Sequence, residues 1–205
     1  MSVRPGTPTL AGRGVAAVPV PRRLPLLTVG IVIFLGSELM FFASLFAMYF
    51  TLRAEHPSLW PPPGTDLAVL RPALFTAVLV GSSFTMQMAD RRIKQGNPMA
   101  MRRWIWLTMA MGLIFLFGQA WDYHDLTGQG VTMASSAYGS AFYTMTGFHA
   151  LHVTAGLIVM LVVLGRAATG AYDHGEHAAV EAATYYWHFV DIVWVALFLT
   201  LFVVR

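Results

Sequence analysis

Five long apolar runs, separated by short polar segments, set the pattern of this chain. They cover about residues 26–51, 72–89, 103–121, 140–164 and 185–204. Each run is close to the roughly 20 residues that an α-helix needs to cross about 30 Å of hydrocarbon. Membrane-spanning β-strands would instead show short segments of alternating polarity. The pattern predicts an all-α integral membrane protein, with a bundle of five transmembrane helices formed by residues 26–205.

The composition agrees with a membrane protein and excludes several kinds of site. Apolar residues make up 57% of the chain and charged residues only 11%, whereas an ordinary soluble domain is about 25% charged. The chain has no cysteine, which excludes disulfides, iron–sulfur clusters and thiolate metal sites. Its net charge of +3 does not indicate nucleic-acid binding, because basic residues collect at the cytoplasmic flanks of membrane helices.

The basic residues are distributed unevenly between the two sides of the predicted bundle. Ten lie on the side of the N-terminus: Arg4, Arg13, Arg22, Arg23, Arg91, Arg92, Lys94, Arg102, Arg103 and Arg166. Three lie on the other side: Arg53, Arg71 and Arg205. The positive-inside rule therefore predicts a cytoplasmic N-terminus and a C-terminus outside the cell. Residues 1–25, rich in Pro, Gly and Arg, are expected to form a disordered or extended cytoplasmic tail.

A single carboxylate lies near the middle of the first run. About 18 Å of helix precede Glu38 at 1.5 Å per residue. A carboxylate at this depth is neutral or partnered, because isolated charge is costly in hydrocarbon. Glu38 is therefore either a proton-linked or partner-anchoring group, or a protonated side chain that hydrogen-bonds a neighbouring helix and fixes packing.

Two histidines lie one turn apart in the fourth run. The spacing of His149 and His152 suits either a metal pair or a pair of interhelical hydrogen-bond donors. A metal would need further ligands, for which Glu38 is a candidate at matching depth. Two ligands one turn apart on one helix cannot approach opposite faces of a heme. We favour hydrogen-bonded structural histidines and predict no metal or cofactor site in this chain.

The fifth run carries a second ionisable pair, His188 and Asp191, three residues apart. Such a pair is costly inside a membrane unless it is buried in protein and partnered. It is predicted near the cytoplasmic end of its span, at a different depth from His149. We expect a hydrogen bond within or between helices, with Asp191 directed toward another subunit. Gln119, which closes the third run, is a further buried polar candidate.

The residues alone indicate no reaction centre. Nucleophile–base sets, phosphate loops and dinucleotide fingerprints are absent from the sequence. We therefore predict no catalytic centre in this chain. The pattern leaves open an accessory subunit of a larger complex, or a proton-linked channel or transporter. The lack of internal repeats disfavours a stand-alone proton-coupled transporter.

A series of motifs resembles one family closely. In order they are SELMFFASLFAMYF, WPPPG, SSFTMQ, GQAWDY, SSAYGSAFYTMTGFHALHV and YYWHFVDIVWVALFL. Together they resemble subunit III of cytochrome c oxidase, a heme-copper oxidase, in the short five-helix form of bacteria such as actinobacteria. The resemblance runs from Leu26 to Arg205. Quinol oxidases and nitric oxide reductases share this subunit type, and the motifs do not separate the three.

The resemblance implies an accessory, non-redox subunit of a bacterial plasma membrane complex that reduces oxygen to water and pumps protons. The resemblance also implies that heme and copper belong to partner subunits. Subunit I would be the main contact of this chain and subunit II a further one, and the complex could be part of a respiratory supercomplex. The family's glutamate falls on Glu38, its TGFH-x-x-HV histidines on His149 and His152, and its WHFVD motif on His188 and Asp191. Phospholipid binding is implied too, although the chain lacks the first two helices that wall the lipid cleft of seven-helix forms.

Overall fold

Five long helices make up the fold. The computed structural model describes residues 26–57, 60, 69–170, 172 and 177–204. The elements are α1 (Leu26–Glu55), α2 (Leu70–Lys94), α3 (Pro98–Gly128), α4 (Ala137–Ala168), α5 (Ala178–Phe198) and a π-helical turn, η2 (Leu199–Val203). No strand occurs among these residues. Five helical segments are long and apolar enough to cross a membrane, so the predicted all-α, five-helix architecture is confirmed.

The helices extend beyond the apolar runs that predict them. α3 starts at residue 98 instead of 103 and ends at 128 instead of 121, and α5 starts at 178 instead of 185. Hydropathy marks the hydrocarbon-embedded part of a helix, whereas capping groups decide where the backbone leaves it. The Asn97 side chain accepts a hydrogen bond from the Ala100 amide at 2.9 Å, and Ser136 accepts one from the Gly139 amide at 3.0 Å.

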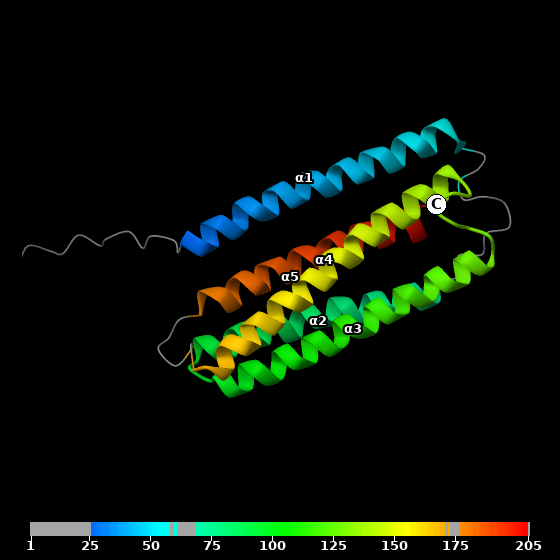
Figure 1. Ribbon diagram of the computed structural model, residues 1–205. Coiled ribbons are helices and arrows are strands. Elements are labelled where there is room, and N and C mark those ends of the chain that lie inside the picture. Colours follow the sequence, from blue (N-terminus) through cyan, green and yellow to red (C-terminus); the bar gives the residue numbers. More distant parts are fainter. Residues whose placement is uncertain (1–25, 58–59, 61–68, 171, 173–176, 205) are drawn as a thin grey trace, which may run out of the picture.

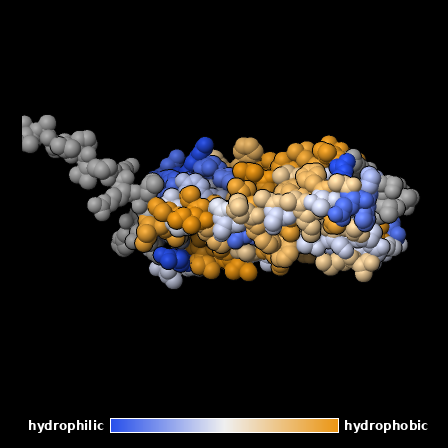
Figure 2. All heavy atoms as spheres, turned by 90° about the horizontal axis from the view of Figure 1, so that it is seen from above, coloured by the Kyte–Doolittle hydropathy of each residue, from blue (hydrophilic) through white to orange (hydrophobic). Residues whose placement is uncertain are grey.

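Three of the other helices pack against α5. Figure 1 shows α1 along one side of the bundle and the α2–α3 pair along the other, with α4 and α5 between them. α5 contacts α1, α2 and α4, whereas α1 contacts α4 and α5. On the face seen in Figure 2, the surface between the two ends of the molecule is mostly hydrophobic, and hydrophilic residues gather toward the ends. The predicted tail, residues 1–25, lies outside the described residues, and the orientation in the membrane stays a prediction.

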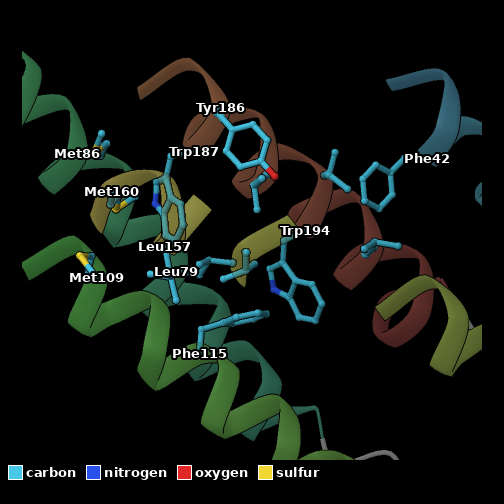
Figure 3. Packing of buried hydrophobic residues seen from close by; sticks show 14 of the residues in the cluster. Phe42, Leu79, Met86, Met109, Phe115, Leu157, Met160, Tyr186, Trp187 and Trp194 are labelled. Atoms are coloured by element: carbon cyan, nitrogen blue, oxygen red, sulfur yellow. The ribbon is translucent and has the colours of Figure 1, made fainter. Parts of the chain in front are cut away.

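Trp187 of α5 anchors the centre of the core. Its ring is fully buried, and its Nε1 donates to Ser82 Oγ of α2 at 2.8 Å. A Cβ at Gly112 of α3 would lie 2.9 Å from this ring, and one at Gly156 of α4 would lie 2.8 Å from it. Trp187 thus touches three neighbouring helices at once, and it points into the packed interior with Leu157 and Met160 nearby (Figure 3).

Trp194, two turns further along α5, is held in a similar way. Its Nε1 donates to Thr76 Oγ1 of α2 at 2.8 Å, and its ring lies 4.6 Å from that of Phe115 of α3 (Figure 3). Two indole hydrogen bonds to one helix leave α5 little freedom to rotate or slide against α2. The polar residues between them, His188 and Asp191, are therefore held at fixed positions along this interface.

Candidate functional site

Glu38 and His152 join α1 to α4 near the middle of both helices. His152 Nε2 lies 2.9 Å from Glu38 Oε2, and both side chains are largely buried, with exposed fractions of 16% and 21%. His152 Nδ1 donates to its own helix, to the Phe148 carbonyl at 2.7 Å. The Phe42 ring packs 4.9 Å from the imidazole. Of the two predicted alternatives, a neutral or a partnered carboxyl group, the structure shows a partner for Glu38.

The hydrogen bonds of this pair limit where its protons lie. The Phe148 carbonyl only accepts, so His152 Nδ1 carries a hydrogen. The remaining Nε2–Oε2 contact needs one proton, which belongs either to the imidazole or to the carboxyl. The two states are an imidazolium–carboxylate pair and a neutral imidazole–carboxylic acid pair. The arrangement can thus hold one exchangeable proton near the middle of α1 and α4.

His149 lies apart from this pair. Its ring is fully buried, 4.8 Å from the ring of Trp194 and 5.7 Å from that of Phe115. Among the described residues, neither of its ring nitrogens has a hydrogen-bond partner. The expectation of a hydrogen-bonded histidine is therefore wrong at this position. Residues three apart differ by about 60° around a helix, which in this bundle directs His152 to α1 and His149 toward α3 and α5.

His188 and Asp191 both contact Ser83 of α2. His188 Nδ1 lies 3.0 Å from Ser83 Oγ, and Ser83 Oγ is hydrogen-bonded to Asp191 Oδ2. His188 Nε2 faces Gln87 Oε1 at 3.3 Å. The contact is therefore interhelical. The expectation that Asp191 is directed toward another subunit is wrong, because its side chain is buried against α2, with 4% of the residue exposed.

The helix that carries this pair begins earlier than the predicted run. α5 begins at Ala178, so His188 lies ten residues into the helix instead of three residues into the apolar run. About 20 Å of helix precede Asp191 at 1.5 Å per residue. Asp191 therefore lies near the middle of the segment formed by α5 and η2.

Polar contacts continue from Gln87 to the end of α2. Gln87 Nε2 donates to Asp90 Oδ2 at 3.4 Å, and Lys94 Nζ lies 2.9 Å from Asp90 Oδ2. Lys94 also lies 3.3 Å from Glu181 Oε1 of α5. These contacts form one continuous polar interface between the two helices, which we call the α2–α5 polar seam. Its members are Asp191, Ser83, His188, Gln87, Asp90, Lys94 and Glu181. Sequence reasoning missed Gln87 and Asp90 as site residues.

A signal for this seam is present in the sequence. Ser83, Gln87 and Asp90 are spaced by four and three residues in an apolar helix, which is the spacing of one helix face. Their common face indicates that α2 presents polar groups to a neighbour. The identity of that neighbour, α5, does not follow from the spacing.

Gln119 joins α3 to α4. Its Nε2 donates to the Thr146 carbonyl at 2.9 Å and to the Tyr123 hydroxyl at 3.2 Å. The Tyr123 hydroxyl also lies 2.7 Å from Thr146 Oγ1. Gln119 is thus one member of a small interhelical network, separate from both ionisable pairs. Within the described part of the chain, no three His, Cys, Asp or Glu side chains gather as a metal site would require, and Glu38, His149 and His152 do not converge.

A groove opens between α1, α4 and α5. It encloses about 530 Å³ and is lined mostly by apolar side chains, among them Leu27, Ile31, Val159 and Tyr186, with Arg166 as its charged residue. Tyr186 also donates its hydroxyl to the His152 carbonyl at 3.0 Å. The groove therefore adjoins the Glu38–His152 pair and is open to the surroundings of the bundle.

Comparison with known proteins places these features in a family context. The family model described as "Cytochrome c oxidase subunit III" matches residues 14–204. The chain is 46% identical over 180 residues to the "Probable cytochrome c oxidase subunit 3" of Mycobacterium tuberculosis (strain ATCC 25618 / H37Rv), which covers 88% of this chain and 89% of the relative. It is 47% identical to that of Nocardia farcinica with the same coverage. It is 41% identical over 175 residues to "Cytochrome c oxidase subunit 3" of Thermostichus vulcanus, with 85% of each chain covered.

Proposed function

Because the chain belongs to the cytochrome c oxidase subunit III family, we propose that it is an accessory, non-redox subunit of a proton-pumping oxidase in an aerobic respiratory chain. The complex reduces oxygen to water with heme and copper held by partner subunits. This chain supports the assembly, turnover stability and proton uptake of subunit I, its main contact, with subunit II as a further partner. It acts in the bacterial plasma membrane, within the oxidase or a larger supercomplex.

The observation that carries this proposal is the Glu38–His152 pair. A titratable pair at the centre of a bilayer is costly, and membrane proteins keep such groups where protons or partners are handled. Its 2.9 Å contact accommodates the exchangeable proton in two states of equal net charge. The pair is thus suited to move a proton between its carboxyl and its imidazole without placing net charge in the membrane.

Replacement of Glu38 tests the proton-linked role. In Glu38→Gln the amide N–H still donates to His152 Nε2, so the link between α1 and α4 persists while the carboxyl proton is lost. We expect the complex to assemble, but to pump protons more slowly in steady state or to inactivate sooner during turnover. Subunit stoichiometry, protons released per electron and active lifetime of the purified complex are the measurements.

Ser37→Ala is the matched control for this variant. The Ser37 hydroxyl bonds its own helix, at the Phe34 carbonyl, so its removal leaves the pair intact and is expected to match wild type. If Glu38→Gln also matches wild type in both pumping and lifetime, Glu38 serves packing alone.

The groove between α1, α4 and α5 supports a second part of the proposal, a bound phospholipid. An apolar groove of this volume fits the carbon atoms of an acyl chain, and the Arg166 guanidinium pairs well with a phosphate. Arg166→Gln is expected to lower the anionic phospholipid that the purified complex retains, measured by lipid mass spectrometry. Retention equal to wild type would show that Arg166 holds no headgroup.

Native mass spectrometry of the complex tests the accessory role itself. We expect this chain to co-purify with a large heme-bearing subunit, and to carry no heme when expressed alone. One heme per molecule on the isolated chain would contradict the proposal. A dicopper domain in subunit II would distinguish a cytochrome c oxidase from a quinol oxidase or nitric oxide reductase.

A further inference from the structure

His188, Ser83 and Asp191 form a continuous hydrogen-bonded row inside the bundle. The Ser83 hydroxyl contacts His188 Nδ1 on one side, at 3.0 Å, and Asp191 Oδ2 on the other. We propose that this row is a proton-sharing triad, which holds one proton in the membrane interior and passes it between His188 and Asp191 through the Ser83 hydroxyl. The triad involves α2 and α5, whereas the Glu38–His152 pair joins α1 and α4, so the two sites hold separate protons.

The protonation of His188 Nε2 follows from its neighbours along the seam. Asp90 is ion-paired with Lys94 at 2.9 Å, so its Oδ2 accepts hydrogen bonds. Gln87 must therefore turn its NH₂ group toward Asp90, which leaves its Oε1 facing His188 Nε2 at 3.3 Å. An amide oxygen only accepts. Nε2 of His188 consequently carries a hydrogen in every state of the triad.

Two arrangements then satisfy all the bonds around Ser83. In one, the imidazolium Nδ1–H of His188 donates to Ser83 Oγ, and the Ser83 hydroxyl donates to the Asp191 carboxylate. In the other, the Asp191 carboxylic acid donates to Ser83 Oγ, and the Ser83 hydroxyl donates to a neutral His188 Nδ1. Conversion moves a proton from His188 to the Ser83 oxygen while the serine proton passes to Asp191. No proton is gained or lost, and the net charge of the triad stays zero.

The surroundings of the triad favour this sharing. Asp191 is 4% exposed, and a fixed carboxylate without compensation is costly at that burial. The other ionisable groups of the seam, Asp90, Lys94 and Glu181, lie beyond Gln87 on the His188 side. Asp191 Oδ1 has no hydrogen-bond partner among the described residues. The row is thus joined to Gln87 and the rest of the polar seam at its His188 end. At its other end lies the buried Oδ1 of Asp191, an acceptor without a hydrogen bond among the described residues.

Infrared spectroscopy of the purified oxidase complex tests the triad at constant pH. The carboxylic-acid band of Asp191 is identified by its loss in Asp191→Asn, and the imidazolium bands of His188 by their loss in His188→Gln, each in the fraction that assembles. In wild type, we expect the Asp191 carboxylic-acid band to gain intensity when the His188 imidazolium bands lose it, and the reverse, as the temperature changes. The ratio of the two intensity changes should stay constant. Bands that vary independently, or the absence of an Asp191 carboxylic-acid band at every temperature, would overturn the proposal.

Ser83→Ala removes the hydroxyl that carries the proton, and the coupled exchange should disappear. Thr85→Ala is the matched control, because the Thr85 hydroxyl of the same helix bonds the Ser82 carbonyl and Thr108 of α3 and not the triad, and the exchange should persist there. Persistence in Ser83→Ala would overturn the role of the hydroxyl. If Ser83→Ala complexes do not assemble, Ser83→Thr is used in their place. The exchange should persist in this variant, with a shifted frequency of the Asp191 carboxylic-acid band. An unshifted frequency would count against the triad.

Discussion

Gly156 and Gly112 matter here for the space they leave, which the ring of Trp187 fills. A Cβ at either position would meet that ring at less than 3.0 Å, a distance that packed side chains do not tolerate without movement. The Trp187 ring cannot retreat easily, since its Nε1 is bonded to Ser82. Small residues are frequent in membrane helices in general, and for Gly112 and Gly156 the neighbour that requires the small size is the Trp187 ring.

Substitution of Gly156 should therefore destabilise the protein. Gly156→Ala forces the Trp187 ring out of its position, and we expect a loss of about 1–3 kcal/mol, typical of an overpacked core. Gly165→Ala, in the same helix but with no atom within 4 Å of the added Cβ, is expected to be neutral or to stabilise α4 by up to about 1 kcal/mol. Thermal unfolding midpoints of the two purified variants give the comparison, and equal midpoints would contradict the packing role of Gly156.

At the level of single residues, position along a helix was easier to predict than direction around it. Hydropathy placed Glu38 near mid-membrane and at a depth matching the histidines of the fourth run, and the structure brings His152 to it. The same spacing did not reveal that His149 turns away. The difference is a rotation of about 60° about α4, and rotation depends on tertiary packing against Phe115 and Trp194, which a single sequence does not encode visibly.

Among the elements, α5 is the one whose placement organises the others. It buries ten of its 21 residues, a larger share than the thirteen of 32 in α4 or the three of 30 in α1. Two indole hydrogen bonds and the polar seam join α5 to α2. The prediction that the fifth run begins at residue 185 missed seven residues of this helix, because residues 178–184 are less apolar and hydropathy alone did not include them. The number and order of helices, in contrast, followed directly from the apolar runs.

Loss of the seam should weaken the assembly of this subunit with its partners. His188→Ala or Asp191→Asn leaves buried polar groups of α2 incompletely bonded, at a cost of about 1–3 kcal/mol, and loosens α5 against α2. We expect less subunit bound to the purified core, with near-normal activity in the complexes that retain it. Quantitative mass spectrometry and oxygen consumption measure the two effects.

Thr184→Ala serves as the control for these variants. The Thr184 hydroxyl is buried on α5 but bonds its own helix, at the Val180 carbonyl, so its removal should leave binding unchanged. Normal binding of His188→Ala together with lost turnover would contradict an assembly role and favour a role in proton transfer alone.

For the whole molecule, the direction in which the bundle crosses the membrane stays a prediction from charge. The absence of cysteine makes a direct test simple, because a single introduced thiol is unique in the chain. Gln95 and Ala134 are exposed residues of the connections at opposite ends of the bundle. In intact cells, a membrane-impermeant maleimide should label Ala134→Cys, and it should label Gln95→Cys only after permeabilisation. The reverse pattern would place the N-terminus outside.

The position of the triad along α5 links it to the membrane voltage. Three residues of helix separate His188 from Asp191, so the shared charge moves by about 4.5 Å along the axis, roughly a sixth of a hydrocarbon layer about 30 Å thick. Carrying one charge across the whole layer corresponds to about 2.3 kcal/mol per 100 mV, and this fraction of the path to about 0.3 kcal/mol. With a cytoplasmic N-terminus, an inside-negative potential favours the proton on His188. The triad would then respond weakly to voltage, because the populations of its two protonation states shift as respiration charges the membrane.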